Sequence, residues 1–113
     1  MKRLALVLIA LGLSFQAAAA TVSNAKITVI RVDSSGLGMI TFDKPLDAPA
    51  ACIHPAYTAS LSFDATTPGG KAILATAIAA KNANSTISSA YGTGACGNYG
   101  GSWVEDLSYF HVN

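Results

Sequence analysis

The sequence predicts a mainly β domain of the α+β class. Short runs with β-branched residues or apolar alternation recur along the chain, and clusters of Gly, Pro and Asn separate them. A single alanine-rich run has helical character instead. The expected strands cover residues 25–33, 37–43, 58–64, 86–91 and 104–112, and the expected helix covers residues 71–81.

The first two strands are expected to form a hairpin. The segment AKITVIRVD is rich in β-branched residues, and its apolar alternation shifts between Val29 and Ile30, which indicates a bulge or burial on both faces. A turn at residues 33–36 then leads into LGMITFD. Pro45 and Pro49 break the next segment, so we expect a loop there.

The third strand and the helix have the clearest patterns. In TASLSFD, the residues Ala59, Leu61 and Phe63 alternate with polar residues, which predicts a strand with one dry and one wet face. Thr67 is a suitable N-cap and Pro68 a suitable first residue for the helix that contains KAILATAIAAK. TISSAY and VEDLSYFHV, on either side of a glycine-rich segment, are the last two strands.

A helix between the third and fourth of five strands is typical of the Greek-key barrel that binds oligonucleotides and oligosaccharides, the OB-fold. We therefore expect residues 21–113 to form one OB-fold-like domain. The two cysteines, Cys52 and Cys96, are expected to form a disulfide, because the N-terminal segment predicts export to an oxidising compartment. This bond would close a loop of about 45 residues and stabilise the domain by about 4 kcal/mol.

Residues 1–20 are expected to be a secretory signal peptide. Two basic residues precede an unbroken apolar run that is too short to span a bilayer, and small residues end the segment. We expect cleavage after Ala20, because Ala18 and Ala20 then occupy the two small-residue positions before the cut. The mature chain is expected to be periplasmic or secreted in a bacterium, with no membrane span.

Charge and glycine spacing argue against two classes of ligand. Without the signal peptide, five basic and six acidic residues remain, so the net charge is −1 and no basic cluster would attract nucleic acid. Gly92, Gly94 and Gly97 have the spacing of a dinucleotide-binding loop, but we expect no helix after them and the chain has no acidic residue about 20 positions later. We expect instead a long flexible loop that brings Cys96 to Cys52, and no cofactor.

No group of residues specifies a catalytic or metal site. Four residues have side chains of metal-ligating types: Cys52, His54, Cys96 and His111. Their spacing lacks the close pairs of structural sites, and oxidised cysteines cannot ligate as thiolates. Glu105 and Asp106 are adjacent in an expected strand, so they should face opposite ways and form no catalytic carboxylate pair. We expect neither an enzyme nor a bound metal.

Aromatic residues gather in and beside the glycine-rich segment. Tyr99 and Trp103 lie in it and Tyr91 precedes it, and with Ser, Asn and Gly neighbours these side chains suit stacking on sugar rings. The alternative is that Trp103 and one tyrosine only close the end of the barrel. Because the loop between the fourth and fifth strands of an OB-fold often binds oligosaccharides, we predict Tyr91, Tyr99 and Trp103 as ligand contacts.

The chain resembles a group of small exported bacterial proteins of uncharacterised function, through ITVIRV, MITFDKPL, Cys52, SLSFD, GGKAILATAIAAK, GTGAC and VEDLSY. More remotely, its layout is similar to the OB-fold B subunits of A-plus-five-B toxins of the subtilase and pertussis kinds. This resemblance implies a ring pentamer that binds host glycans, and it assigns no particular sugar-contact residue.

These observations together predict an exported, non-catalytic binding module for a glycan. The alternative is an envelope protein, structural or inhibitor-like, that binds a protein partner through a sheet edge or a helix face. A small hydrolase or metal protein is the third hypothesis.

Overall fold

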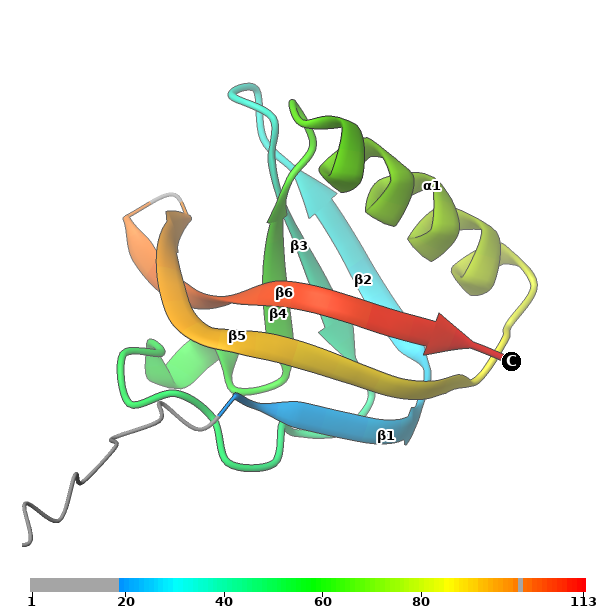
Figure 1. Cartoon of the computed structure of the whole chain (residues 1–113), viewed down its shortest axis with the longest axis horizontal. Helices are drawn as coiled ribbons and strands as arrows, with labels where there is room; N and C mark the ends of the chain where they lie inside the picture. The colour runs from blue at the N-terminus through cyan, green and yellow to red at the C-terminus, as the bar shows by residue number, and fades with distance from the viewer. Residues whose placement is uncertain (1–18, 100) are drawn as a thin grey trace, which may run out of the picture.

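The computed structural model describes residues 19–99 and 101–113, which form one mixed six-stranded sheet with one α-helix (Figure 1). The predicted mainly β, α+β class is confirmed. The elements are β1 (Thr21–Ala25), β2 (Ile27–Val32), β3 (Leu37–Phe42), the 3-10 helix η1 (Pro55–Tyr57), β4 (Ser60–Asp64), α1 (Pro68–Asn82), β5 (Ile87–Tyr99) and β6 (Ser102–Val112). Most of the predicted signal peptide, residues 1–18, lies outside the described residues, so it stays a prediction.

The strands are ordered β1-β5-β6-β4-β3-β2 in the sheet. Neighbouring strands are antiparallel except β4 and β6, which are parallel. The two strands at the ends of this order, β1 and β2, follow each other in the chain with only Lys26 between them. No pairing between β1 and β2 closes the sheet within the described part of the chain, so it is not a closed barrel, and the expected five-stranded OB-fold-like barrel is not confirmed.

The strand expected at residues 25–33 corresponds to β2, and β1 is an additional strand before it, which makes six strands instead of the predicted five. Asn24 has a φ of 51°, a left-handed conformation that Asn tolerates better than most residues and that changes the direction of the chain at the end of β1. The predicted irregularity is present as a shift of register between Ile27 and Val29, two residues before the expected place.

The glycine-rich segment is a strand and not the long loop that we expected. β5 continues to Tyr99, and β6 begins at Ser102. A register shift between Gly92 and Cys96 accommodates the extra residues as a bulge, and pairing with β6 then resumes opposite Glu105. The ladder with β6 outweighs the poor strand propensity of glycine, because strand formation depends more on cross-strand neighbours than on the residue itself.

Strand β4 was expected to have one wet face, but both of its faces are covered. Ser60 and Ser62 are buried together with Leu61 and Phe63. Their hydroxyl groups have partners: Ser60 Oγ lies 2.8 Å from Thr41 Oγ1, and Ser62 Oγ donates to a carboxylate on β6 at 2.9 Å. Small hydroxyl side chains can therefore occupy this central strand without an unpaired polar atom.

The helix begins as predicted. Thr67 is its N-cap and accepts a hydrogen bond from Gly70 N at 2.9 Å, and Pro68 is its first residue. The buried helical residues Ala77 and Ala80 belong to the main core cluster, with Ile73 and Leu74 packed beside them. Figure 1 shows α1 on one side of the sheet, beside β2.

The predicted disulfide between Cys52 and Cys96 is confirmed, with a Cα–Cα distance of 6.2 Å. Cys52 lies in the segment between β3 and β4, and Cys96 lies in β5. The bond therefore joins the irregular part of the chain to the longest strand of the sheet, close to where β5 leaves its bulge.

Candidate functional site

The structure separates the three predicted ligand contacts, and Tyr99 is the most buried of them. Its side chain is 6% exposed and packs with Met39 and Val104 in a small second core cluster. The guanidinium carbon of Arg31 lies 5.8 Å from the centre of its ring. Burial raises the pKa of the Tyr99 phenol above its ordinary value of 10.0. Tyr99 therefore offers a ligand only part of its ring.

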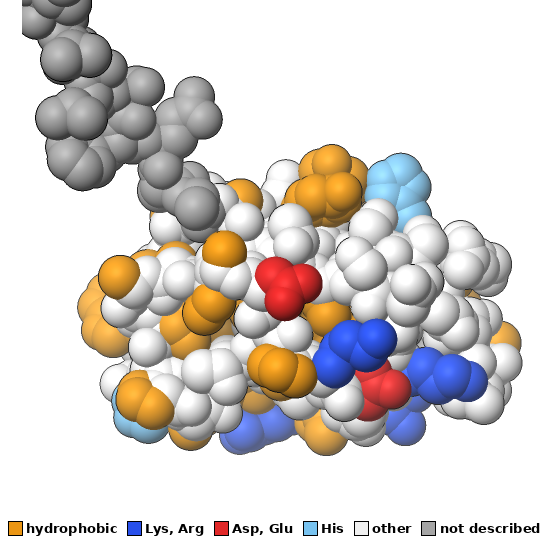
Figure 2. Space-filling view, turned by 90° about the horizontal axis from the view of Figure 1, so that it is seen from below, with side chains coloured by type: hydrophobic (Ala, Val, Ile, Leu, Met, Phe, Trp, Pro, Cys, Tyr) orange, Lys and Arg blue, Asp and Glu red, His pale blue; other side chains and the backbone are white. Residues whose placement is uncertain are grey.

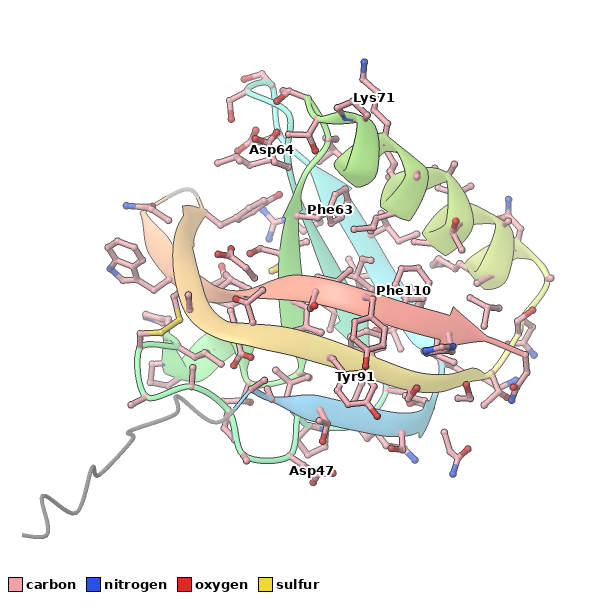
Figure 3. The ribbon with its side chains drawn as sticks, in the orientation of Figure 1. Asp47, Phe63, Asp64, Lys71, Tyr91 and Phe110 are labelled. Carbon is pink, nitrogen blue, oxygen red and sulfur yellow. A yellow bond between two sulfur atoms is a disulfide. The ribbon has the colours of Figure 1, made fainter. Side chains whose placement is uncertain are left out.

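Tyr91 belongs to a row of aromatic side chains on β5 and β6. Its ring stacks on Tyr109, the residue directly opposite it, with centroids 4.7 Å apart and an interplanar angle of 21°. His111 packs edge-on against Tyr109 with centroids 5.5 Å apart. Figure 3 shows Tyr91 well away from Phe63 and Asp64, so this row is separate from the region around the end of β4.

Trp103 lies in a third place. Its side chain is 50% exposed and lines a hollow of about 370 Å³ together with Cys52 and Cys96. The Trp103 carbonyl accepts a hydrogen bond from His54 N at 2.9 Å, which attaches the segment before η1 to β6. Among the described residues, the side chains around this hollow provide one hydrogen-bonding group, the indole N–H of Trp103.

A cleft, also of about 370 Å³, lies between the sheet strands β3, β4, β5 and β6. Its lining residues are Leu37, Ser62, Phe63, Asp64, Gly97, Asn98, Tyr99 and Asp106. This volume is within the range of small-ligand sites, and the lining combines apolar rings with a few polar side chains, as such sites usually do. We therefore take this cleft as the candidate site.

Three polar side chains of the cleft each use one oxygen for an internal hydrogen bond. Asp106 Oδ1 accepts from Ser62 Oγ at 2.9 Å, whereas Asp64 Oδ1 and Asn98 Oδ1 accept from groups in their own turns. The second polar atom of each has no hydrogen-bond partner among the described residues. Asp64 and Asn98 are exposed, and Asp106 is half-buried in a part of the structure where no buried side-chain N or O lacks a partner, so these three atoms can bind a ligand.

Local contacts also fix the charge of Asp64 and the position of Asp106. The side-chain hydroxyl and the backbone N–H of Thr66 hold the pKa of Asp64 below its ordinary value of 3.8, so this group is ionised at neutral pH. A Cβ atom at Gly97 would lie 2.9 Å from Asp106 Oδ1. Because Gly97 has no side chain, the Asp106 carboxylate can occupy the space beside the cleft.

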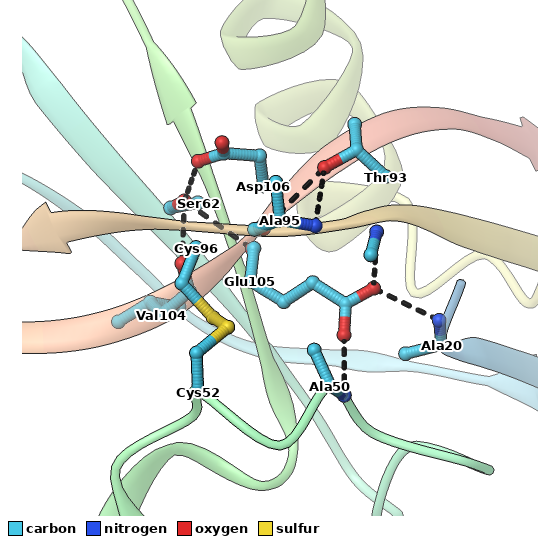
Figure 4. The surroundings of a disulfide bond; sticks show 11 residues. Ala20, Ala50, Cys52, Ser62, Thr93, Ala95, Cys96, Val104, Glu105 and Asp106 are labelled. Atoms are coloured by element: carbon cyan, nitrogen blue, oxygen red, sulfur yellow. Dashed lines mark hydrogen bonds between the residues drawn. A yellow bond between two sulfur atoms is a disulfide. The ribbon is translucent and has the colours of Figure 1, made fainter. Parts of the chain in front are cut away.

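Glu105 and Asp106 face opposite ways, as their adjacency in a strand predicts. Figure 4 shows the Asp106 side chain directed toward Ser62 and the Glu105 side chain directed toward Ala50 and Ala20. Sequence reasoning set Asp106 aside because it forms no pair with its neighbour. It missed that the same alternation places Asp106 in a cleft with residues of other strands.

Comparisons with protein-family models, with curated proteins and with solved structures gave no match for this chain. Among the described residues, no helix is long and apolar enough to cross a membrane. The same part of the chain contains no cluster of three or more His, Cys, Asp or Glu side chains arranged to hold a metal ion. On the face seen in Figure 2, the Lys and Arg side chains lie mostly along one edge, close to an acidic side chain, and hydrophobic side chains are spread over the rest of the face.

Proposed function

We propose that this protein is an exported, non-catalytic binding module and that its cleft binds a glycan. The main support is the combination in one cleft of free polar atoms on Asp64, Asn98 and Asp106 with the rings of Phe63 and Tyr99. Sugars present hydroxyl groups that carboxylates and amides bind, and C–H faces that pack on aromatic rings.

The strand order supports an OB-fold-like architecture. β1 and β2 can be counted as one strand interrupted at Lys26, which gives five strands in total. This first strand pairs with the second strand, β3, and with the fourth, β5. The third strand, β4, pairs with the fifth, β6. The same strand pairing is expected for the OB-fold, a partly open Greek-key barrel that often binds oligosaccharides. The cleft lies beside the end of β5, where the connection to the last strand begins.

The state of Asp64 argues against this residue acting as the proton donor of a glycosidase. A glycosidase needs one carboxylic acid whose pKa is raised so that it can donate a proton to the leaving group. The pKa of Asp64 is instead lowered by Thr66. Asp64 therefore acts as a hydrogen-bond acceptor in our proposal and not as an acid.

The proposal is tested with a glycan array probed by the mature, disulfide-bonded protein. We expect Asp106→Asn and Asn98→Ala to weaken binding to the best glycan at least ten-fold. The amide oxygen introduced by Asp106→Asn can still accept the bond from Ser62, so the fold should be kept. The matched controls are Tyr109→Ala and Trp103→Ala, which alter the aromatic row and the hollow and should leave the affinity unchanged. A correctly folded protein that binds no glycan on the array would contradict the proposal, as would release of cleaved sugar.

The second candidate function is binding of a protein partner in the cell envelope, and the observation that favours it is Trp103. A half-exposed tryptophan next to a hollow is a frequent centre of protein interfaces. Pull-down from an envelope extract separates the two candidates, because Trp103→Ala should abolish capture of a protein partner and Asp106→Asn should not. Native mass spectrometry of the same preparation tests the ring pentamer that the toxin resemblance implies.

A further inference from the structure

Glu105 is a fully buried carboxylate that contacts no cationic side chain among residues 19–99 and 101–113 (Figure 4). Its Oε1 accepts a hydrogen bond from Ala50 N at 2.9 Å. Its Oε2 accepts from Ala20 N at 2.8 Å and from Gly94 N at 3.2 Å. All three donors are backbone N–H groups. A buried charge is costly unless an opposite charge accompanies its hydrogen bonds.

Ala20 is the first of the described residues that is buried in the folded domain. It is 0% exposed and belongs to the main core cluster, whereas Ala19 is exposed. Besides the bond from Ala20 N to Glu105, the Ala20 carbonyl accepts a hydrogen bond from Gly92 N at 2.8 Å. Ala20 is therefore part of the folded domain, one residue before β1.

We propose that the signal peptide is removed after Ala19, so that Ala20 is the mature N-terminus and its α-ammonium group forms a buried ion pair with Glu105. This inference rests on the export that is part of the proposed function. The sequence permits the cut, because Ala17 and Ala19 satisfy the small-residue rule as well as Ala18 and Ala20 do. The contacts of Ala20 distinguish the two cuts.

A cut after Ala20 would remove groups that the folded domain uses. Gly92 N would lose its acceptor, Glu105 would lose its shortest hydrogen bond, and the core would lose a buried methyl group. Each lost partner of a buried polar group destabilises a protein. A cut after Ala19 keeps these contacts and places a positive charge on the nitrogen that lies 2.8 Å from Glu105 Oε2. The neutral hydrogen bond becomes charge-assisted, which is the stronger kind.

The first test is the N-terminal residue of the protein exported by a bacterial host with its own signal sequence. Intact mass and N-terminal peptide mapping should give Ala20, a chain heavier by one alanine than one that begins at Thr21. A mature chain that begins at Thr21, or at any other residue, overturns this inference alone. An uncleaved precursor overturns the export in the proposed function and this inference with it.

The second test measures the ion pair through the stability of three chains. Chains that begin at Ala19, Ala20 and Thr21 are released from a fusion by a protease that leaves no extra residue, and each is unfolded in urea at pH 7. The chain that begins at Ala19 keeps the Ala20 N–H but moves the ammonium to an exposed residue. We expect its folding equilibrium constant to be at least ten-fold lower than that of the chain that begins at Ala20, which corresponds to about 1.4 kcal/mol. Equal stability of these two chains would overturn the ion pair.

The variant Glu105→Gln completes a double-mutant cycle with the same starting residues. Because glutamine is neutral and similar in shape, the difference between the Ala19 and Ala20 chains should fall below two-fold. A ten-fold difference that persists in this variant would show that the charge of Glu105 is not involved. If the variant does not fold, the comparison of the unsubstituted chains decides the matter.

Discussion

Gly92 lies against the carboxylate of Glu105, so closely that a Cβ atom at position 92 would overlap Glu105 Oε2. The backbone of the same glycine donates to the Ala20 carbonyl, next to the nitrogen that Glu105 accepts from. The first glycine of the apparent dinucleotide-binding spacing is thus required by a buried carboxylate of the partner strand. This contact explains the glycine without a phosphate ligand.

We predict that Gly92→Ala destabilises the domain by about 1–3 kcal/mol, because the added methyl group must displace a carboxylate held by three backbone groups. Urea unfolding followed by circular dichroism measures this loss. Gly69→Ala is the matched control. Its Cβ would have no neighbour within 4 Å, and alanine in a helix should stabilise by about 0.5 kcal/mol. An unchanged midpoint for Gly92→Ala would contradict the contact.

Replacing both cysteines, Cys52→Ser with Cys96→Ser, should lower the free energy of unfolding by about 4 kcal/mol, the chain-entropy value for a loop of this length. The bonded residues are 44 positions apart, and no other disulfide is present among the described residues. Urea unfolding of the variant beside the oxidised and reduced parent protein measures the loss. A loss below about 1 kcal/mol would show that the entropic model does not apply here.

Thr66→Val should raise the pKa of Asp64 toward 3.8, because valine keeps the shape of threonine and removes the hydroxyl that contributes most to the lowered pKa. A carboxyl group whose pKa is lower in the folded than in the unfolded state stabilises the fold at pH values above its unfolded-state pKa. This stabilisation is lost as the pH falls through the folded-state pKa. The parent protein should therefore lose stability below about pH 4, and Thr66→Val should lose less over the same range.

Side-chain NMR titration of Asp64 measures this shift directly. Thr76→Val is the control, because the Thr76 hydroxyl donates to Ala72 O within the helix and should not affect Asp64. Asp33 has a similarly lowered pKa, caused first by the Ser35 hydroxyl, and it should titrate identically in both variants. An unaltered Asp64 pKa in Thr66→Val would contradict the role of the hydroxyl.

Tyr91 and Tyr109 should show a coupling energy of about 0.5–1.5 kcal/mol in a double-mutant cycle of alanine substitutions, because stacked aromatic pairs contribute beyond the area that they bury. Unfolding free energies of the two single variants and the double variant give the coupling. A second cycle of Tyr91→Ala with Trp103→Ala should be additive, since Trp103 pairs with Asn98 farther along the two strands. Additivity in the first cycle would mean that the stacking does not stabilise the fold.

Several features could be predicted because they depend on residues close in sequence. Thr67 and Pro68 start the helix through contacts within one turn. The opposite directions of Glu105 and Asp106 follow from the period of a strand. The disulfide could be predicted for a different reason, since Cys52 has only one potential partner in the chain.

The candidate cleft could not be predicted in the same way. Its polar residues Asp64, Asn98 and Asp106 belong to three strands, and only the pairing of β4 with β6 and of β6 with β5 brings them together. Of the three predicted ligand contacts, Tyr99 alone lines this cleft. Tyr91 lies elsewhere because it and Tyr99 are far apart on the long, extended strand β5, and Trp103 belongs to a different strand, β6.

Local sequence was sufficient to predict the fold class, the start of the helix and the disulfide, because hydrophobic period, capping and cysteine count can be read from the chain directly. Long-range contacts were needed to show that the glycine-rich segment is a strand, that β4 is covered on both faces and that Ala20 belongs to the domain. In each of these cases the deciding contacts come from residues distant in the chain. Pairing with β6 and burial of Glu105 outweigh the local preferences from which sequence reasoning starts.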